Sequence, residues 1–196
     1  RPRNQFKCHT IGIMSTPVVN FLDSMYCYRG ETLDKFGHDS TGIVQYQFNQ
    51  QGFRSAYDYD FVPKQALFGA SLVFGIGVVS SKIFSSYFPQ SHNYGLAGAY
   101  TDKDIFQTAV NFVNSDLYTP QVNLVVVWRN HKTDNLLSYY QELQKYNFKQ
   151  FFCYDNLNLS NCYRVPKQVD EDVSKTHMGP KSHYVFYRIL CSLLNR

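Results

Sequence analysis

The stretch that most constrains the fold is residues 121–128, QVNLVVVW, in which the last five residues are all apolar. It is long enough for one strand, and its later positions are mostly β-branched valine. A strand that is apolar on both faces needs a covering layer on each side, which is typical of the central strands of parallel sheets. The run therefore predicts a parallel sheet with helices on both faces.

The segments around this run alternate between strand and helix patterns. Further strands are predicted at residues 67–70, 92–96 and 148–154, and helices within residues 73–87 and at residues 101–114, 134–146 and 180–194. Thr101 followed by Asp104 has the spacing of a capping box. Residues 156–174 are polar and are predicted to form a loop. Strands and helices that alternate at this spacing predict an α/β fold with a mainly parallel sheet.

The N-terminal third follows no such pattern. Residues 44–48, VQYQF, alternate as a half-buried strand does, and the turn-forming NQQG comes directly after them. We expect residues 1–63 to form an irregular cover with a short hairpin, and residues 64–196 to form the α/β core. The length of 196 residues fits one domain.

Charge and hydropathy exclude two classes of partner. The net charge of +4 is small, and no run of Lys and Arg forms a track for nucleic acid. The most apolar stretch, residues 66–84, contains three glycines and Lys82. This stretch fits a strand, a turn and a helix better than a lipid-facing helix. We therefore expect a soluble protein that binds no nucleic acid and has no membrane span.

The five cysteines are scattered without C-x-x-C spacing, which argues against a zinc site. An odd number leaves at least one thiol unpaired and slightly favours a reducing, cytoplasmic location. Export stays open, because Cys153 and Cys162 could bridge a loop. The chain begins at Arg1 and not at Met, and the sequence leaves open whether an upstream segment was removed. Oligomeric state has no sequence signal.

Four short segments lie at the ends of predicted strands or just before the last helix. They are GASL with Ser71, NYGLAGA at residues 93–99, WRNH with Asn130, and THMGP with His177. Acyl transfer uses these groups: a hydroxyl attacks a carbonyl, a histidine takes its proton, and N–H groups bind the oxyanion. Because parallel strands end at one edge of a sheet, these groups are predicted to meet there.

In this order, the four segments resemble the SGNH, or GDSL-type, hydrolase superfamily. The resemblance covers about residues 49–194 and includes NQQGFR at residues 49–54, which is similar to the lead-in of many bacterial members. It implies a three-layer α/β/α, flavodoxin-like fold with about five strands. It also implies an ester hydrolase that needs no metal or organic cofactor.

The resemblance assigns a role to each matching residue. Ser71 is the nucleophile and also donates its backbone N–H to the oxyanion, as does Gly98, with Gly95 as the weaker match. Asn130 offers its side-chain amide to the same oxyanion. His177 is the base.

Two departures from the family pattern matter. The family's aspartate, three residues before the histidine, is Ser174 here, which leaves Asp172, Asp170 or a main-chain carbonyl to support the imidazole. Trp128 replaces a glycine and either narrows the acyl pocket or packs against a lid. Losing the supporting carboxylate costs about 10⁴ in kcat in a serine protease.

Each of these residues could instead have a purely structural role. Ser71 and Asn130 could cap the helices that come after them, Gly98 could only permit a turn, and His177 could be a surface histidine. Arg54 and Arg129 are candidates for binding an anionic substrate group, or are structural hydrogen-bond donors.

The predicted function is a serine esterase, with removal of O-acetyl groups from a carbohydrate or small molecule as the expected chemistry. An O-acyltransferase of the same fold is the first alternative. A catalytically weak glycan-binding or protein-binding domain is the second, and Ser174 and Trp128 favour it.

Overall fold

A computed structural model describes residues 49, 51–96, 100–129, 135–152, 161–171 and 177–194. Five strands form one all-parallel sheet in the order β2-β1-β3-β4-β5. The strands are β1 (Gln65–Gly69), β2 (Ser91–Gly95), β3 (Asn123–Trp128), β4 (Lys149–Phe152) and β5 (Cys162–Arg164). This confirms the α/β class. The predicted strand at residues 44–48 lies outside the described residues.

The helices are α2 (Ser71–Phe74), α3 (Asp102–Val113), α4 (Leu136–Gln144) and α5 (Pro180–Leu194), with 3-10 turns η1 (Ser80–Lys82) and η2 (Phe84–Tyr87). The last helix has the predicted bounds. Helix α3 begins after Thr101, whose backbone N–H donates to the Asp104 carboxylate at 2.6 Å. The predicted capping box is therefore confirmed.

The helix predicted within residues 73–87 is wrong. Helix α2 stops after four residues at Gly75, which has a positive φ of 78°. A Cβ at this position would lie 2.2 Å from a methyl carbon of Ile83, so the chain turns back tightly on itself here. Two short 3-10 turns come next in place of a long helix.

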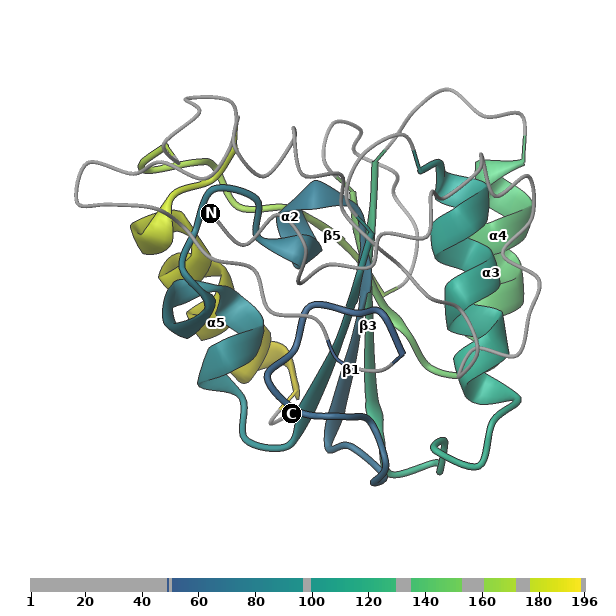
Figure 1. The fold of residues 1–196 in the computed structure, drawn as a ribbon. Coiled ribbons are helices and arrows are strands. Elements are labelled where there is room, and N and C mark those ends of the chain that lie inside the picture. Colours follow the sequence, from purple (N-terminus) through teal and green to yellow (C-terminus); the bar gives the residue numbers. More distant parts are fainter. Residues whose placement is uncertain are drawn as a thin grey trace.

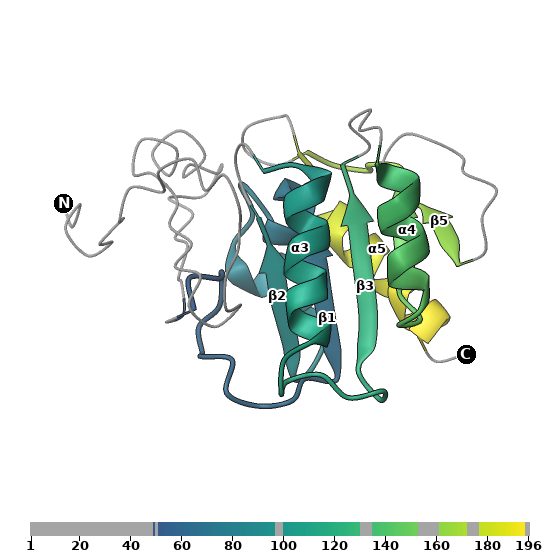
Figure 2. The ribbon, with the colours of Figure 1, turned by 90° about the vertical axis from the view of Figure 1, so that its right-hand side faces the viewer.

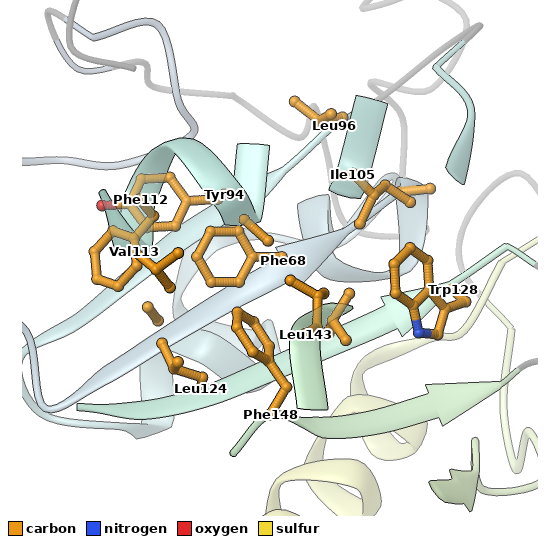
Figure 3. Packing of buried hydrophobic residues seen from close by; sticks show 14 of the residues in the cluster. Phe68, Tyr94, Leu96, Ile105, Phe112, Val113, Leu124, Trp128, Leu143 and Phe148 are labelled. Atoms are coloured by element: carbon orange, nitrogen blue, oxygen red, sulfur yellow. The ribbon is translucent and has the colours of Figure 1, made fainter. Parts of the chain in front are cut away.

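The sheet is covered on both faces (Figures 1 and 2). Helices α3 and α4 pack on one face, where the aromatic rings of Phe68, Tyr94 and Phe112 form the centre of the larger hydrophobic core (Figure 3). Helices α2 and α5 pack on the other face, where Phe186 of α5 contacts Phe151 of β4 with ring centroids 5.0 Å apart. Alternate residues of β1 therefore supply both cores, as the apolar strand pattern predicts.

Among the described strands, β2 lies at the edge of the sheet, and its outer backbone groups bond to tyrosine hydroxyls. The N–H of Asn93 donates to the Tyr59 hydroxyl at 2.8 Å, and that hydroxyl lies 3.0 Å from the Asn93 carbonyl, to which it donates. Tyr57 donates to the Ser91 carbonyl at 2.8 Å. An edge strand otherwise presents unpaired backbone groups, so these side chains take the place of a neighbouring strand.

Replacing Tyr59 by phenylalanine is expected to lower the free energy of unfolding by about 1–3 kcal/mol, because the buried Asn93 N–H loses its acceptor. Urea unfolding at neutral pH measures the change. Tyr57→Phe is the matched control: its hydroxyl is partly exposed and water can replace it, so the loss should stay below about 1 kcal/mol. Equal losses in the two variants would contradict the proposed difference between the buried Tyr59 hydroxyl and the partly exposed Tyr57 hydroxyl.

Candidate functional site at the carboxyl edge of the sheet

Ser71 lies two residues beyond Gly69, the last residue of β1, and is the first residue of α2. Strands β2 and β3 lie on opposite sides of β1, so the chain reverses its direction of winding between β1 and β3. In open parallel sheets, ligands bind outside the carboxyl ends of the strands at such a switch point. Ser71 comes after β1 and Arg129 comes after β3, which places both at this edge.

Two glycines allow α2 to lie close against the strand ends. A Cβ on Gly69 would be 2.4 Å from a methyl carbon of Val73 and 3.0 Å from the Val127 carbonyl oxygen. A Cβ on Gly95 would be 2.2 Å from the backbone nitrogen of Phe74. The glycines thus set where the Ser71 turn sits above the sheet.

The backbone N–H of Gly95, the weaker oxyanion candidate, is engaged in the fold. It donates to the side-chain oxygen of Asn93 at 2.8 Å. The amide nitrogen of the same Asn93 side chain donates to the Val73 carbonyl at 2.9 Å. Asn93 therefore joins β2 to α2, and this contact favours a structural role for Gly95.

The Arg54 side chain is buried, whereas binding an anionic substrate group requires an exposed guanidinium. Its guanidinium donates to the carbonyls of Phe74 at 2.9 Å, Val78 at 2.5 Å and Gly75. It also lies over the Phe74 ring, with its central carbon 5.4 Å from the ring centroid. A guanidinium enclosed in this way cannot reach substrate, so the substrate-binding assignment is corrected.

Trp128 requires the same correction. Its side chain has no exposed area, and its indole N–H donates to the side-chain oxygen of Gln150 at 2.9 Å. It packs in the larger core, on the face of the sheet that α4 covers (Figure 3). Its ring lies nearly parallel to the Tyr139 ring, with centroids 6.3 Å apart. The ring therefore belongs to the hydrophobic core on the α4 side of the sheet and is enclosed by it.

Arg129, the first residue after β3, links the end of this strand to the start of α3. Its backbone N–H donates to the carboxylate of Asp102 at 2.6 Å, and its guanidinium donates to the Tyr100 carbonyl. Asp102 is fully buried at the start of α3. Sequence patterns missed this carboxylate, because an acidic residue in the first turn of a helix is ordinary. The role of Arg129 in binding substrate stays a prediction.

His177 lies three residues before α5 and is half-buried. Helix α5 begins at the side of the sheet where the strands end and packs on the same face as α2 (Figure 1). His177 and Ser71 thus adjoin two helices that cover the same face of the sheet, and the contact between their side chains stays a prediction. Gly98, Asn130, Asp172 and Ser174 lie outside the described residues.

His92 is a buried histidine that the sequence analysis did not single out. It stacks on Tyr59 with ring centroids 4.0 Å apart, and its Nδ1 lies 2.8 Å from the Tyr94 hydroxyl. Burial away from water lowers the pKa of His92 to about 3. The imidazole is therefore neutral in the folded protein at neutral pH.

This low pKa predicts acid sensitivity. The unfolded chain binds a proton at a pKa of about 6.5 while the folded chain does not, so stability is full above pH 6.5 and falls between pH 6.5 and 3. At pH 5 the loss from His92 is about 2 kcal/mol, at about 1.4 kcal/mol per pKa unit. Urea unfolding at pH 7 and at pH 5 measures this loss of unfolding free energy.

His92→Phe should remove this part of the pH dependence, and the control His177→Ala should retain it. An unchanged pH dependence in His92→Phe would contradict the prediction.

No helix in the described part of the chain is long and apolar enough to cross a membrane. Within the same residues, no three His, Cys, Asp or Glu side chains are grouped so that they could hold a metal ion. No protein-family model, curated protein or solved structure matches the chain. Function is therefore inferred from the residues and their positions in the fold.

Proposed function

We propose that the protein is a serine esterase of the SGNH, or GDSL, type that hydrolyses O-acetyl or similar small esters on a carbohydrate or small molecule. The observation that carries the proposal is the position of Ser71. It comes just after a buried parallel strand, opens a short helix and lies at the switch point of the sheet.

The strand order supports the finer assignment. The order β2-β1-β3-β4-β5 is that of flavodoxin-like doubly wound sheets, which the SGNH resemblance implies. Ser71, Gly98, Asn130 and His177 occur in the family order, and His177 lies next to the final helix as the family pattern requires.

In the proposed reaction, the Ser71 hydroxyl attacks the ester carbonyl while His177 takes its proton. The backbone N–H groups of Ser71 and Gly98 and the amide of Asn130 bind the oxyanion. The tetrahedral intermediate collapses as His177 protonates the leaving alcohol. Water then attacks the acyl-enzyme, gives its proton to His177, and releases the acid while the proton returns to Ser71. Asp172 is the proposed support for the imidazole.

Two alternatives differ in the fate of the acyl-enzyme or in whether it forms. An O-acyltransferase would pass the acyl group to a sugar hydroxyl in place of water. A glycan-binding or protein-binding domain would form no acyl-enzyme. The burial of Trp128 removes one of the two sequence features that favour the latter.

A phosphonofluoridate probe tests the nucleophile, because an activated serine displaces fluoride and retains the phosphonyl group. We expect one phosphonyl mass increment on the peptide that contains Ser71. His177→Ala should slow the reaction at least about 10²-fold, the usual contribution of a general base. Acid-denatured protein is the control. Equal labelling of native and denatured protein, or no label on Ser71, would contradict the proposal.

A further inference from the structure

The carboxylate of Asp170 clamps the start of α5. One oxygen accepts the backbone N–H of Lys181 at 2.8 Å, and the other accepts the N–H of Ser182 at 2.7 Å and its hydroxyl at 2.6 Å. Although partial burial opposes ionisation, the hydrogen bonds from Ser182 and Lys181 lower the pKa of Asp170 overall. Both oxygens are thus directed at the helix.

Ser182 completes the clamp from the helix side. It is buried, and its hydroxyl oxygen accepts the backbone N–H groups of Val169 at 2.9 Å and Asp170 at 3.0 Å. The backbone of Gly179 donates to the Asp170 carbonyl at 3.1 Å. A Cβ on Gly179 would lie 2.4 Å from the Glu171 carbonyl oxygen and 2.7 Å from the Asp170 carboxyl carbon, so the two segments are packed without spare room.

Two further contacts lie at and beside His177. The side-chain amide of Gln168 donates to the His177 carbonyl at 3.2 Å, and Glu171 forms an antiparallel bridge with Met178. The chain that leaves at residue 171 and returns at residue 177 is therefore held at both ends. The backbone at His177 is thus fixed by the bond to its own carbonyl and by the pairing of the next residue, Met178.

We propose that Asp170 and Ser182 are positioning residues that hold His177 in place for the reaction. The inference rests on the proposed function, in which His177 is the base. Asp170 then acts on the backbone of the histidine loop and is not the carboxylate that orients the imidazole. A catalytic group displaced by about 1 Å can cost 10²-fold in rate, so a clamp of this kind has a kinetic effect beyond stability.

The test compares Asp170→Ala, Ser182→Ala and Gly179→Ala with Asp104→Ala, which removes the capping carboxylate of α3 on the opposite face of the sheet. With p-nitrophenyl acetate, we expect each clamp variant to lower kcat about 10- to 100-fold and to leave KM within about twofold. Asp104→Ala should leave both constants unchanged. Asp170→Asn, which keeps one acceptor oxygen, should recover part of the loss.

Hydrogen–deuterium exchange on the same variants reports on the loop without using activity. Faster exchange over residues 168–179 in the clamp variants, but not in Asp104→Ala, is expected. Unchanged exchange there, or faster exchange with unchanged kcat, would overturn the proposal. If wild type and Ser71→Ala hydrolyse the ester at the same rate, the proposed function fails, and the catalytic role of the clamp fails with it. The exchange measurement does not depend on activity, so it still shows whether the clamp holds the loop.

Discussion

Replacing Ser71 by alanine is expected to lower kcat for p-nitrophenyl acetate at least about 10³-fold, since loss of a nucleophilic serine costs even more in a well-studied protease. The residual rate should equal that of buffer with an unrelated protein. Ser71 is the first residue of α2 and is half-exposed, so a smaller side chain there fits without a rearrangement. The loss should therefore be kinetic, with an unchanged unfolding midpoint.

Ser192→Ala is the matched control for this measurement. Ser192 is exposed on α5, and its hydroxyl donates to the Ile189 carbonyl of its own helix at 2.8 Å. Its removal should leave kcat and KM within about twofold, as expected for a surface change. Ser71→Ala with wild-type activity would remove Ser71 from the mechanism and leave the fold assignment intact.

Replacing Arg54 by methionine is expected to lower the free energy of unfolding by about 3–5 kcal/mol, because removing the charged partner leaves several buried acceptors unsatisfied. The carbonyls of Phe74, Gly75 and Val78 all receive hydrogen bonds from this guanidinium. They belong to the turn at the end of α2, so the Ser71 segment should loosen first. Urea unfolding measures the total loss.

Arg54→Lys should restore little of the loss, because an ammonium cannot reproduce the fork of the guanidinium. Arg188→Met is the matched control: Arg188 is exposed on α5, and its removal should cost below about 1 kcal/mol. A loss below about 1 kcal/mol in Arg54→Met would mean that the buried guanidinium adds nothing net to stability.

The elements that the sequence predicts well have strong local signals. The valine-rich run that became β3 is apolar on both faces, and Thr101 with Asp104 caps α3 as predicted. Strand β5 lay within a predicted polar loop and was missed. It has only three residues, and pairing with β4 decides its structure. That contact depends on the tertiary fold and not on the local sequence.

At the candidate site too, features with a local sequence pattern could be predicted, and features that depend on tertiary packing could not. The position of Ser71 beyond a buried strand could be predicted, because a buried strand that ends at a glycine has a local pattern. The burial of Arg54 and Trp128 could not, because it depends on α2 and α4 packing over them. The clamp of Asp170 on Ser182 joins residues twelve positions apart across a turn, and no local pattern marks it.

The pairing of Ser71 with His177 is tested most directly by a crystal structure that gives the distance between the Ser71 hydroxyl oxygen and the nearer ring nitrogen of His177. If His177 activates Ser71, the two atoms should lie about 2.6–3.2 Å apart, the reach of a nucleophile and its base. A separation above about 6 Å, well beyond any hydrogen bond, with the hydroxyl enclosed by protein, would contradict this pairing.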